Sequence, residues 1–514
     1  MPTSNPHTTS ASDADEGSVA VSWPTLRRRL REHDLLASVQ AGPEAPAPDS
    51  LVVEHLTDDS RTVEPGGAFV AIRGATADGH SFIDKAVANG ARLVVCEAVS
   101  DSVRERVPDA VFAQVSDTRV ALAEMAAALY DDPADALRLV GVTGTNGKTT
   151  VAFLVHHLLD ALGTTTGLLS TIEVRTGSDT TDSALTTPGP IELQRTLRRM
   201  VDDGCTACAM EVSSHALDQE RVHGLDFAVG IFTNITTDHL DYHGTPRAYR
   251  QAKKKLFDDL NADATALYNA DDEAGTQMVA DTAATPVSYA LDRNADIRPD
   301  ILESRIEGLR LTLDGQERTF RLAGRFNAYN LAAAYGAGRA LGHEANSVLD
   351  ALADAPPVPG RFEQLTFEHG PTVVVDYAHT PDALENILQA VRETADDDAT
   401  LWCVFGCGGD RDTSKRGTMG GIAEQLADRV VVTSDNPRTE EPEAIMDDIR
   451  QGVHRPGEMK WIVDREEAIA AAADGTGPND IVVIAGKGHE TYQTIGTEKR
   501  SFDDRNMARK YFSR

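Results

Sequence analysis

The chain has 514 residues, a formal net charge of −32 and a pI near 4.8. With 41% hydrophobic and 25% charged residues it has the composition of a globular protein, and its length predicts about three domains. The negative charge argues against nucleic acid as a partner, because the phosphate backbone would be repelled. Since no apolar stretch approaches the length of a membrane span and no signal peptide is found, we expect a cytoplasmic protein without membrane insertion. We also expect a monomer.

From the first residues onward, the pattern predicts four segments. Residues 1–20 are small, polar and acidic, which is typical of a disordered tail. Residues 21–136 contain short apolar runs separated by helix-like stretches, as in a small α/β domain. Residues 137–357 contain further strand-like runs and a hairpin pattern about Asp314–Gly315. A proline-rich linker leads into residues 358–514, where strands that each enter a polar loop predict an open parallel sheet.

Five scattered cysteines do not suggest a disulfide framework. Cys205 and Cys208 form a C-x-x-C pair, which is found in redox centres and in zinc sites. No second pair stands at metal spacing, and both residues lie in the apolar run CTACAMEV. We therefore predict that these two side chains are small buried hydrophobic groups.

One stretch predicts a nucleotide site. Residues 137–142 form an apolar run typical of a buried strand, and apolar residues recur at helical spacing from Val151 onward. The turn between them is rich in glycine, whose backbone N–H groups can surround an anion at the start of a helix. Lys148 would reach the terminal phosphates and Thr149 would serve Mg²⁺. The alternative is a glycine-rich turn with a solvated lysine. It does not explain why a strand-like run precedes this turn and a helical pattern follows it, as in a phosphate loop. The predicted loop residues are Gly144, Thr145, Asn146, Gly147, Lys148, Thr149 and Thr150.

Three further side chains are candidates for a metal site. Glu211 ends a strand-like run, where a carboxylate can hold Mg²⁺ directly or through water. His239 lies in the stretch NITTDHLDYHG, which could equally be an Asp-rich turn with surface histidines. Lys253 belongs to AKKKLF, which could be a solvated helix face, although neighbouring like charges favour the neutral amine. From the residues alone, these alternatives stay open.

A series of motifs resembles those of the Mur ligases, in the same order: TGTNGKTT, TTP, EVSSHAL, TNITTDHLDYHG, NADD, GRFNAYN, PGRFE, DYAHTPD, GCGGDRD, DNPR and GKGHE. The resemblance extends from Leu51 to the C-terminus. It implies an α/β fold of three domains: a small UDP-binding N-terminal domain, a central P-loop ATPase with a mostly parallel sheet, and a C-terminal Rossmann-like domain. It also implies an ATP-dependent ligase of peptidoglycan synthesis, and so of cell-wall biogenesis, cell shape and cell division.

The resemblance assigns substrate contacts to the first half of the chain. Residues implied at the uridine end are Ser60, Arg61, Thr76 and Ala77. Residues implied to contact the muramoyl dipeptide are Thr186, Thr187, Ser213, Gln219 and Arg221. An arginine suits a carboxylate or pyrophosphate because its planar fork binds two oxygens at once.

For ATP and metal, the resemblance implies that Lys253 is carbamylated by CO₂, which turns its amine into a carboxylate for Mg²⁺. Glu211 and His239 resemble the other metal-site residues, with Thr149 from the loop. Asn327 and Asn330 resemble adenine contacts, and the alternative for them is turn or cap chemistry. Further ATP contacts are implied for Arg361 and Asp376.

The motif DNPR resembles that of family members that add meso-diaminopimelate rather than L-lysine. Diaminopimelate carries a second carboxylate that lysine lacks, which an arginine can bind. The alternative is a plain Asn-Pro turn after a strand. Asp435 and Glu490 could bind the ammonium group, and Gly486 would allow the substrate to approach the backbone closely. The implied amino-acid contacts are Arg411, Asp435, Asn436, Pro437, Arg438, Gly486 and Glu490.

The implied reaction transfers the γ-phosphate of ATP to the D-glutamate carboxylate of UDP-N-acetylmuramoyl-L-alanyl-D-glutamate. The acyl phosphate is then attacked by the neutral amine of diaminopimelate. One alternative is a related ligase with L-lysine or another amine as substrate. An alternative from a different class is a non-catalytic P-loop nucleotide switch, which would need no amino-acid site.

Overall fold

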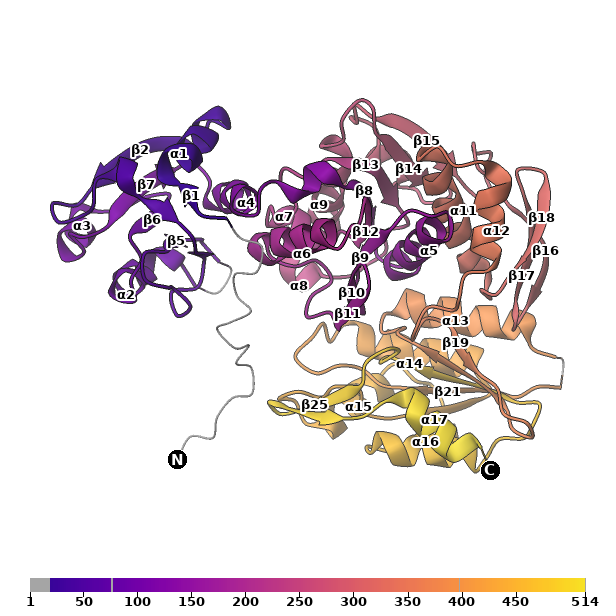
Figure 1. Ribbon diagram of the computed structural model, residues 1–514. Coiled ribbons are helices and arrows are strands. Elements are labelled where there is room, and N and C mark those ends of the chain that lie inside the picture. The colour runs from indigo at the N-terminus through magenta and orange to yellow at the C-terminus, as the bar shows by residue number, and fades with distance from the viewer. Residues whose placement is uncertain (1–18, 75–76, 397, 514) are drawn as a thin grey trace. The chain divides into compact units, whose positions relative to one another are not determined.

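The computed structural model describes residues 19–74, 77–396 and 398–513 (Figure 1). The tail predicted for residues 1–20 lies outside these ranges except for its last two residues, and Thr76 of the predicted uridine loop also lies outside them. In the described part of the chain, no helix is both long and apolar enough to cross a bilayer.

The chain forms two compact units, each built from two stretches of sequence. The first unit comprises Met1–Val140 and Thr164–Ala228, and the second comprises Gly141–Gly163 and Val229–Arg514. The chain first passes from the first unit to the second within strand β8 (Arg138–Thr143), returns at residues 163/164, and passes to the second unit again at residues 228/229.

The first unit begins with a sheet of strand order β2-β7-β6-β5-β4, parallel except for the pairing of β2 with β7. Strands β5, β6 and β7 are apolar at nearly every position because helices cover both faces. Helices α1 and α4 pack on one face and α2 on the other. This is the small α/β arrangement predicted for the N-terminal part. Its elements are β1 (Val21–Ser22), α1 (Trp23–Glu32), β2 (Leu36–Ala41), β3 (Val52–Val53), β4 (Leu56–Thr57), β5 (Ala68–Val70), α2 (Ile83–Ala88), β6 (Leu93–Cys96), α3 (Asp101–Arg106), β7 (Val111–Val115) and α4 (Thr118–Leu129).

The second stretch of the first unit adds strands in the order β11-β10-β9-β12-β8. The pairing of β12 with β9 is parallel, and β10 and β11 form an antiparallel edge. The elements are β9 (Thr166–Leu169), β10 (Glu173–Thr176), β11 (Asp179–Asp182), α6 (Pro190–Asp202), β12 (Ala207–Glu211) and α7 (Ser214–Asp218). Glu211 is therefore the last residue of a buried strand, as the sequence pattern predicts.

The second unit begins with the strand order β8-β13-β14-β15, in which β13, β14 and β15 are parallel. The predicted hairpin is confirmed: β17 and β18 pair antiparallel, with Leu313 opposite Gln316. Asp314 and Gly315 both have positive φ, which a two-residue turn of this hand requires. The elements are α5 (Lys148–Ala161), β13 (Phe227–Phe232), α8 (Leu240–His243), α9 (Pro246–Asp258), β14 (Thr265–Asn269), α10 (Gly275–Met278), β15 (Thr285–Tyr289), β16 (Asp300–Arg305), β17 (Gly308–Leu313), β18 (Gln316–Phe320), α11 (Arg325–Ala340) and α12 (Ala345–Ala353).

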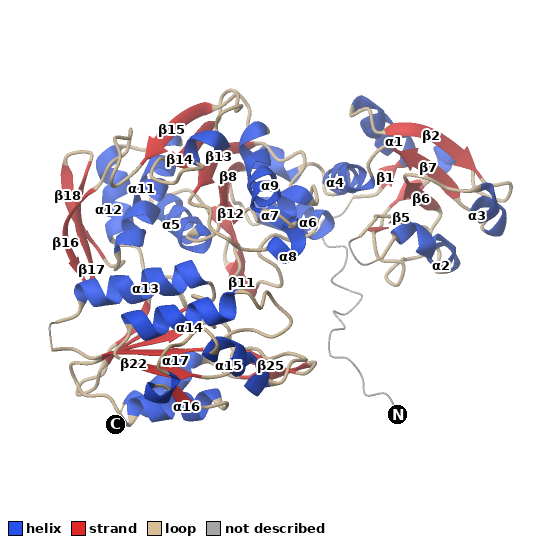
Figure 2. Ribbon diagram, turned by 180° about the vertical axis from the view of Figure 1, so that it is seen from behind, coloured by secondary structure: helices blue, strands red, loops and turns tan. Residues whose placement is uncertain are grey.

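The second unit ends with a sheet of strand order β19-β20-β24-β21-β22-β23, parallel except for the pairing of β19 with β20. Alternate residues of β20, β21 and β24 pack against α13 and α14 on one face and α16 and α17 on the other (Figure 2). This is the predicted open parallel sheet. The elements are β19 (Glu363–Leu365), β20 (Thr372–Asp376), α13 (Pro381–Thr394), β21 (Leu401–Phe405), α14 (Lys415–Leu426), β22 (Arg429–Val432), α15 (Pro442–Arg450), β23 (Lys460–Trp461), α16 (Arg465–Ala473), β24 (Ile481–Ala485), β25 (Tyr492–Ile495), β26 (Glu498–Ser501) and α17 (Asp504–Phe512).

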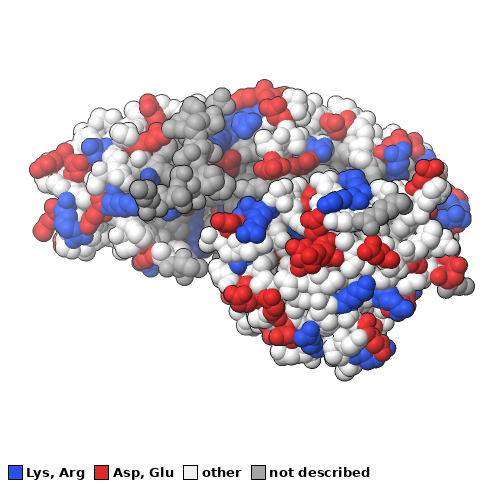
Figure 3. All heavy atoms as spheres, turned by 90° about the horizontal axis from the view of Figure 1, so that it is seen from below, with Lys and Arg blue, Asp and Glu red and all other residues white. Residues whose placement is uncertain are grey.

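The cysteines are buried, and charges of both signs are mixed on the surface. All five cysteines are free and buried, including Cys205 and Cys208, which confirms that they act as small hydrophobic groups. On the face drawn in Figure 3, lysines and arginines lie beside acidic side chains rather than in one basic patch. Surface ion pairs of this kind contribute little to stability individually.

One buried carboxylate in the first unit gathers charges from three segments. Glu124 on α4 is 2% exposed and accepts from Arg29 Nε of α1 at 2.6 Å. His33 Nε2 and His223 Nε2 lie 3.4 and 3.3 Å from its two oxygens. Although burial opposes it, hydrogen bonds with His223 and Arg29 lower the pKa of Glu124 to about 2. Hydrogen bonds with Glu124 and Glu220 raise the pKa of His223 to about 9. Because Arg29 already takes one carboxylate oxygen, this cluster is an ion-pair centre that ties α1, α4 and the turn after α7 together.

Replacing His223 with glutamine is expected to destabilise the protein at neutral and mildly acidic pH but not at alkaline pH. The unfolded imidazole has a pKa of about 6.5, so the contribution is complete below that pH and is lost as the pH rises through about 9. Discounted for partial exposure, the expected difference is about 1–2 kcal/mol at pH near 6. Urea unfolding at about pH 6 and about pH 9.5 measures it, with His369→Gln at an exposed site as control. Equal destabilisation at both pH values would contradict the proton linkage.

Candidate active site

The predicted phosphate loop connects β8 to α5 in the second unit. Gly144 (φ 153°) and Gly147 (φ 88°) adopt conformations that other residues rarely take. A Cβ on Gly144 would lie 1.9 Å from Thr233 Oγ1, and one on Gly147 would lie 2.7 Å from Asn330 Oδ1. Both positions therefore require glycine. The loop ends at the N-terminus of α5, where backbone N–H groups without helical partners can bind an anion.

Lys148 is the first residue of α5, and its ammonium stays over the loop. Its Nζ donates to the carbonyl oxygens of Gly144 at 3.0 Å and Thr145 at 2.9 Å. Next to it, Thr149 and Thr150 are buried, with 5% and 6% exposed. A lysine and a hydroxyl at the start of this helix are the groups that a triphosphate and its metal require.

The loop is held in shape by residues far from it in the sequence. Thr233 Oγ1 and Asn234 Nδ2, just after β13, donate to the carbonyl oxygen of Asn146 at 2.6 and 3.1 Å. The Asn146 and Thr145 N–H groups donate back to Asn234 Oδ1 and O at 2.9 and 2.8 Å. Asn146 Nδ2 also donates to Asp382 Oδ2, in the first turn of α13, at 2.7 Å. The loop is thus preformed, and a side chain from the C-terminal sheet region contacts it.

Lys253 on α9 contacts the same loop. It is 1% exposed, and its Nζ donates to Gly144 O at 2.7 Å and lies 4.6 Å from the Tyr249 ring centre. Burial, reinforced by the positive charge of Lys148, lowers the pKa of Lys253 well below its ordinary range, while Asp238 acts in the opposite direction. A low pKa favours the neutral amine, and a neutral amine is the form that reacts with CO₂. The environment of Lys253 therefore fits carbamylation.

His239 precedes α8 in a left-handed conformation, with φ 53°. Its Nε2 lies 3.5 Å from Asp238 Oδ2. Partial burial lowers the pKa of His239, Asp238 opposes this, and the positive charges of Lys148 and Lys253 add to the lowering. A neutral imidazole is the form that binds metals. His239, Lys253 and the phosphate loop thus lie within one electrostatic environment.

The four residues implied as other ATP contacts also lie in the second unit. Asn327 and Asn330 are buried on α11, where Asn330 Nδ2 donates to Asn327 Oδ1 at 2.8 Å. Arg361 Nη2 donates to Thr149 Oγ1 at 3.0 Å, while its Nε is buried without a partner. Burial raises the pKa of Asp376, and the charge of Arg361 opposes the rise. A buried guanidinium N–H beside the phosphate loop is available for an anionic ligand.

In the first unit, Glu211 and the residues implied at the muramoyl dipeptide form one hydrogen-bonded cluster. Thr171 N–H and Oγ1 donate to the Glu211 carboxylate at 2.7 and 3.2 Å. Thr171 Oγ1 also lies 3.1 Å from Thr186 Oγ1. Thr187 Oγ1 donates to the Glu211 carbonyl oxygen at 2.9 Å and accepts from the N–H of Ser213 at 3.1 Å.

The same cluster extends to the turn after α7. Arg221 Nη1 donates to the carbonyl oxygen of Thr187 at 2.8 Å. Its Nε and Nη2 donate to Gln219 Oε1 at 3.1 and 2.7 Å. The five implied dipeptide residues are therefore neighbours in the fold, although they span a long stretch of the sequence.

The residues implied at the uridine end lie in the N-terminal part of the first unit. Ser60 is buried, and its carbonyl oxygen accepts from Asn89 Nδ2 at 2.7 Å. Arg61 is exposed and pairs with Asp59 at 2.7 Å. Ala77 accepts a backbone hydrogen bond from Gly74 at 2.9 Å.

Polar loops follow β22 and β24 at the same edge of the C-terminal sheet. A Cβ on Gly486 would lie 2.5 Å from Asp435 Oδ2, so glycine lets this carboxylate lie against the backbone. Glu490 Oε2 accepts from Asn436 Nδ2 at 2.8 Å and from Lys487 Nζ at 2.7 Å. Two carboxylates, one of them paired with a buried lysine, thus line this edge.

Two arginines flank the glycine turn after β21. A Cβ on Gly408 would lie 3.0 Å from Arg438 Nη1 and 3.8 Å from Arg411 Cγ. Arg438 has φ 51°, an uncommon value for this residue type, and its Nη1 donates to Gly409 O at 2.6 Å. A Cβ on Gly409 would lie 1.9 Å from Pro437 O, so the two loops are in close contact. The edge presents acids and arginines together, which suits a ligand bearing both amines and carboxylates.

Sequence reasoning missed two residues of this region. Lys487 is fully buried between Asn436 and Glu490, and it lies inside the motif GKGHE. Asp382 contacts the phosphate loop and ends the motif DYAHTPD. Both stood in motifs that signalled function, but a lysine and an acid beside a loop carry no pattern that identifies their partners.

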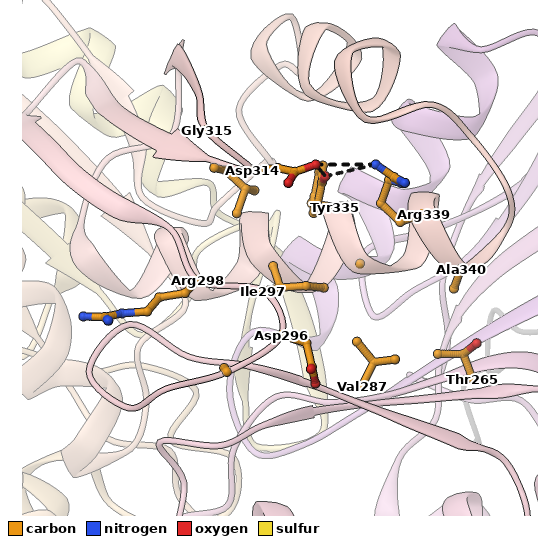
Figure 4. A pocket seen from close by; sticks show the side chains of 13 residues that line it. Thr265, Val287, Asp296, Ile297, Arg298, Asp314, Gly315, Tyr335, Arg339 and Ala340 are labelled. Carbon is orange, nitrogen blue, oxygen red and sulfur yellow. Dashed lines mark hydrogen bonds and ion pairs between the residues drawn. The ribbon is translucent and has the colours of Figure 1, made fainter.

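A cavity of about 580 Å³ lies elsewhere in the second unit, near the second half of α11 (Figure 4). Tyr335 donates its hydroxyl hydrogen to Asp314 Oδ2 at 2.8 Å, and Arg339 Nη1 lies 3.6 Å from the same carboxylate. None of the implied site residues lines this cavity. The candidate site is therefore defined by side-chain chemistry rather than by this cavity.

Family models match three parts of the chain. They are described as the Mur ligase family catalytic domain at residues 52–130, the Mur ligase middle domain at 142–338, and the Mur ligase glutamate ligase domain at 360–488.

Relatives of similar length match nearly the whole chain. UDP-N-acetylmuramoyl-L-alanyl-D-glutamate–2,6-diaminopimelate ligase of Parabacteroides distasonis is 44% identical over 482 residues, covering 93% of this chain and 98% of that protein. The protein of the same name from Cytophaga hutchinsonii is 46% identical over 455 residues, covering 88% and 93%. A solved structure with this name superposes with a TM-score of 0.64 at 32% identity, covering 96% of this chain and 99% of that one. MurF from Acinetobacter baumannii, at 17% identity and a TM-score of 0.62 over 91% and 96% of the two chains, shares the fold.

Proposed function

The chain belongs to the Mur ligase family, and from that premise we propose that it joins meso-diaminopimelate to UDP-N-acetylmuramoyl-L-alanyl-D-glutamate at the expense of ATP. The observation that carries the choice of amino acid is the arrangement at the carboxyl ends of β21, β22 and β24. There Arg411 and Arg438 flank Gly408, while Asp435 lies against Gly486 and Glu490 against Asn436. The arginines would bind the distal carboxylate, which lysine lacks, and the acids would bind ammonium.

In the second unit, the loop residues Gly144 to Thr150 would bind the phosphates of ATP, with Lys148 beside the transferred group. Asn327 and Asn330 would contact adenine, and Arg361 and Asp376 would hold the nucleotide from the other side. Much of the rate would come from positioning and charge neutralisation, as in other phosphoryl transfers.

The metal-site residues proposed for Mg²⁺ are Thr149, Glu211, His239 and carbamylated Lys253. When bound, Mg²⁺ would neutralise charge on the transferred phosphoryl group and on the D-glutamate carboxylate. Three observations support the donor set: Glu211 is a buried strand-end carboxylate, His239 favours the neutral imidazole, and Lys253 favours the neutral amine.

The remaining substrate contacts would be divided over the first unit. Ser60, Arg61, Ala77 and the loop containing Thr76 would bind the uridine end. The cluster of Thr186, Thr187, Ser213, Gln219 and Arg221 would bind the muramoyl dipeptide. A carboxylate is a poor electrophile, so phosphorylation of D-glutamate supplies a good leaving group before the amine attacks.

Phosphate release tests this function. With ATP, Mg²⁺ and UDP-N-acetylmuramoyl-L-alanyl-D-glutamate, we expect release that depends on meso-diaminopimelate, together with a tripeptide product by mass. L-Lysine in parallel should give much less, since it leaves the arginines without a carboxylate. If phosphate is released with L-lysine but not with diaminopimelate, the protein is still a ligase, but the proposed amino-acid substrate is wrong. A regulatory nucleotide switch would show no amino-acid-dependent release.

A further inference from the structure

Two loops carry the arginines that the proposed function uses to select diaminopimelate, and both contain strained backbone. Loop A (residues 406–411) follows β21, and loop B (residues 435–440) follows β22. Asp410 in loop A and Arg438 in loop B have φ values of 52° and 51°. Non-glycine residues persist in this conformation only where their surroundings enforce it. The two strained positions lie in or directly beside the arginine sites.

Loops A and B are joined by direct hydrogen bonds. Gly409 N–H donates to Asn436 O at 2.9 Å, and Arg438 Nη1 donates to Gly409 O at 2.6 Å. Thr439 Oγ1 donates to the Asp410 carboxylate at 2.8 Å. Asp410 and Thr439 are exposed whereas Asn436 is buried, so the outer part of this contact depends on support from beneath to keep one geometry.

Arg416, in the first turn of α14, supplies that support from a buried position. Its side chain is 1% exposed, and Nη1 and Nη2 donate to the two oxygens of Glu440 in loop B at 2.9 Å each. Nη2 also donates to the carbonyl oxygen of Gly408 in loop A at 3.2 Å. Glu440 Oε1 in turn accepts from the N–H of Asp410 at 2.5 Å. A single guanidinium therefore binds both loops.

The other partner of Arg416 lies outside the loops. Asp448 on α15 accepts from Nη1 at 2.9 Å. Asp448 thus contacts the same guanidinium as Glu440, and among the described residues no hydrogen bond or ion pair joins its side chain to loop A or loop B. The two acids form a natural pair of matched test positions.

We propose that Arg416 is a positioning residue for the selection of the amino-acid substrate. This proposal rests on the proposed function. By clamping loop A to loop B through Glu440 and Gly408, it fixes the relative placement of Arg411 and Arg438. A two-arginine site for a carboxylate requires placement within about half an ångström, which loosened loops would not provide. Arg416 itself is buried behind the loops and acts through the two arginines.

The test compares Glu440→Gln and Arg416→Gln with the matched control Asp448→Asn. For the first two, we expect the KM for meso-diaminopimelate to rise about tenfold or more, with kcat at saturation changed less than about threefold. The KM values for ATP and for the UDP-dipeptide should stay within about twofold, and preference over L-lysine should fall. Arg416→Lys should not restore selection, because a lysine cannot bind two carboxylate oxygens in a planar fork. Asp448→Asn should leave the KM for diaminopimelate near that of the wild type.

The kinetic results of these variants either support or overturn the positioning role of Arg416. A folded Glu440→Gln enzyme with unchanged amino-acid preference would overturn the proposal, as would equal losses in Glu440→Gln and Asp448→Asn. Equal rises in all three KM values would show that Arg416 only supports the domain, and would also overturn it. If Arg416→Gln fails to fold, Glu440→Gln alone carries the comparison. Absence of diaminopimelate-dependent phosphate release in the wild type would instead refute the proposed function.

Discussion

Replacing Lys148 with alanine is expected to lower kcat/KM for ATP about 10²–10³-fold, because it removes a preorganised cation from the charge that develops during phosphoryl transfer. In the structure, the Lys148 ammonium donates to the carbonyl oxygens of Gly144 and Thr145, at 3.0 and 2.9 Å. A bound phosphate would replace those neutral partners with a stronger, charged one. The loss should therefore appear in catalysis more than in folding.

Phosphate release with saturating dipeptide and diaminopimelate measures the Lys148→Ala effect. Lys510→Ala is the control, since that lysine lies on α17 and pairs with Glu466 at the surface. Thermal unfolding should show both variants near the wild type. If the activity of Lys148→Ala is within threefold of the wild type, the phosphate loop does not take part in phosphoryl transfer as proposed.

The local patterns of the sequence were sufficient for the nucleotide loop and for the C-terminal sheet. Glycine spacing, an apolar run before it and helical periodicity after it are short-range signals, and the structure has β8, the loop and α5 at these places. The buried strands β20, β21 and β24 were equally readable, because a parallel sheet covered on both faces is apolar throughout. The hairpin at Asp314–Gly315 followed from the alternating pattern on both sides of an Asp-Gly turn.

Side-chain contacts between residues far apart in the sequence could not be predicted, because no local pattern encodes them. The contact of Asn146 with Asp382 and the clamp of Arg416 on Glu440 each join residues brought together only by tertiary structure. The sequence also gives no direct sign that Lys487 is fully buried beside Glu490.

The lysine run on α9 shows what a closer reading could have recovered. Buried positions on this helix are Tyr249, Ala252, Lys253, Leu256 and Phe257. They recur at the three- and four-residue spacing of one helix face, so Lys253 belongs to the apolar stripe. Lys254 lies off that face and pairs with Asp258 and Asp281. Helical phase, rather than the run of charge, distinguishes the buried lysine from its partly exposed neighbour.

Lys253→Ala is expected to abolish most of the ligase activity, with a loss of about 10²–10³-fold, because it would remove the carbamylated lysine proposed to hold Mg²⁺. Burial and the charge of Lys148 lower the pKa of Lys253, so the neutral amine is available to CO₂. The matched control is Lys254→Ala, which removes an adjacent lysine whose ion pairs raise its pKa although burial opposes them.

A readout independent of activity separates carbamylation from a simple structural role for Lys253. With ¹³CO₂ supplied, wild type and Lys254→Ala should show one slowly exchanging ¹³C carbamate resonance, and Lys253→Ala should lack it. Lys148→Ala provides a further check: removing its charge relieves one cause of the lowered Lys253 pKa, so the neutral amine becomes scarcer and the resonance should weaken at neutral pH. A carbamate signal that survives Lys253→Ala would place the modification elsewhere. Full activity after CO₂ depletion would show that Lys253 acts as an amine, since the carboxylate proposed for Mg²⁺ would then be absent.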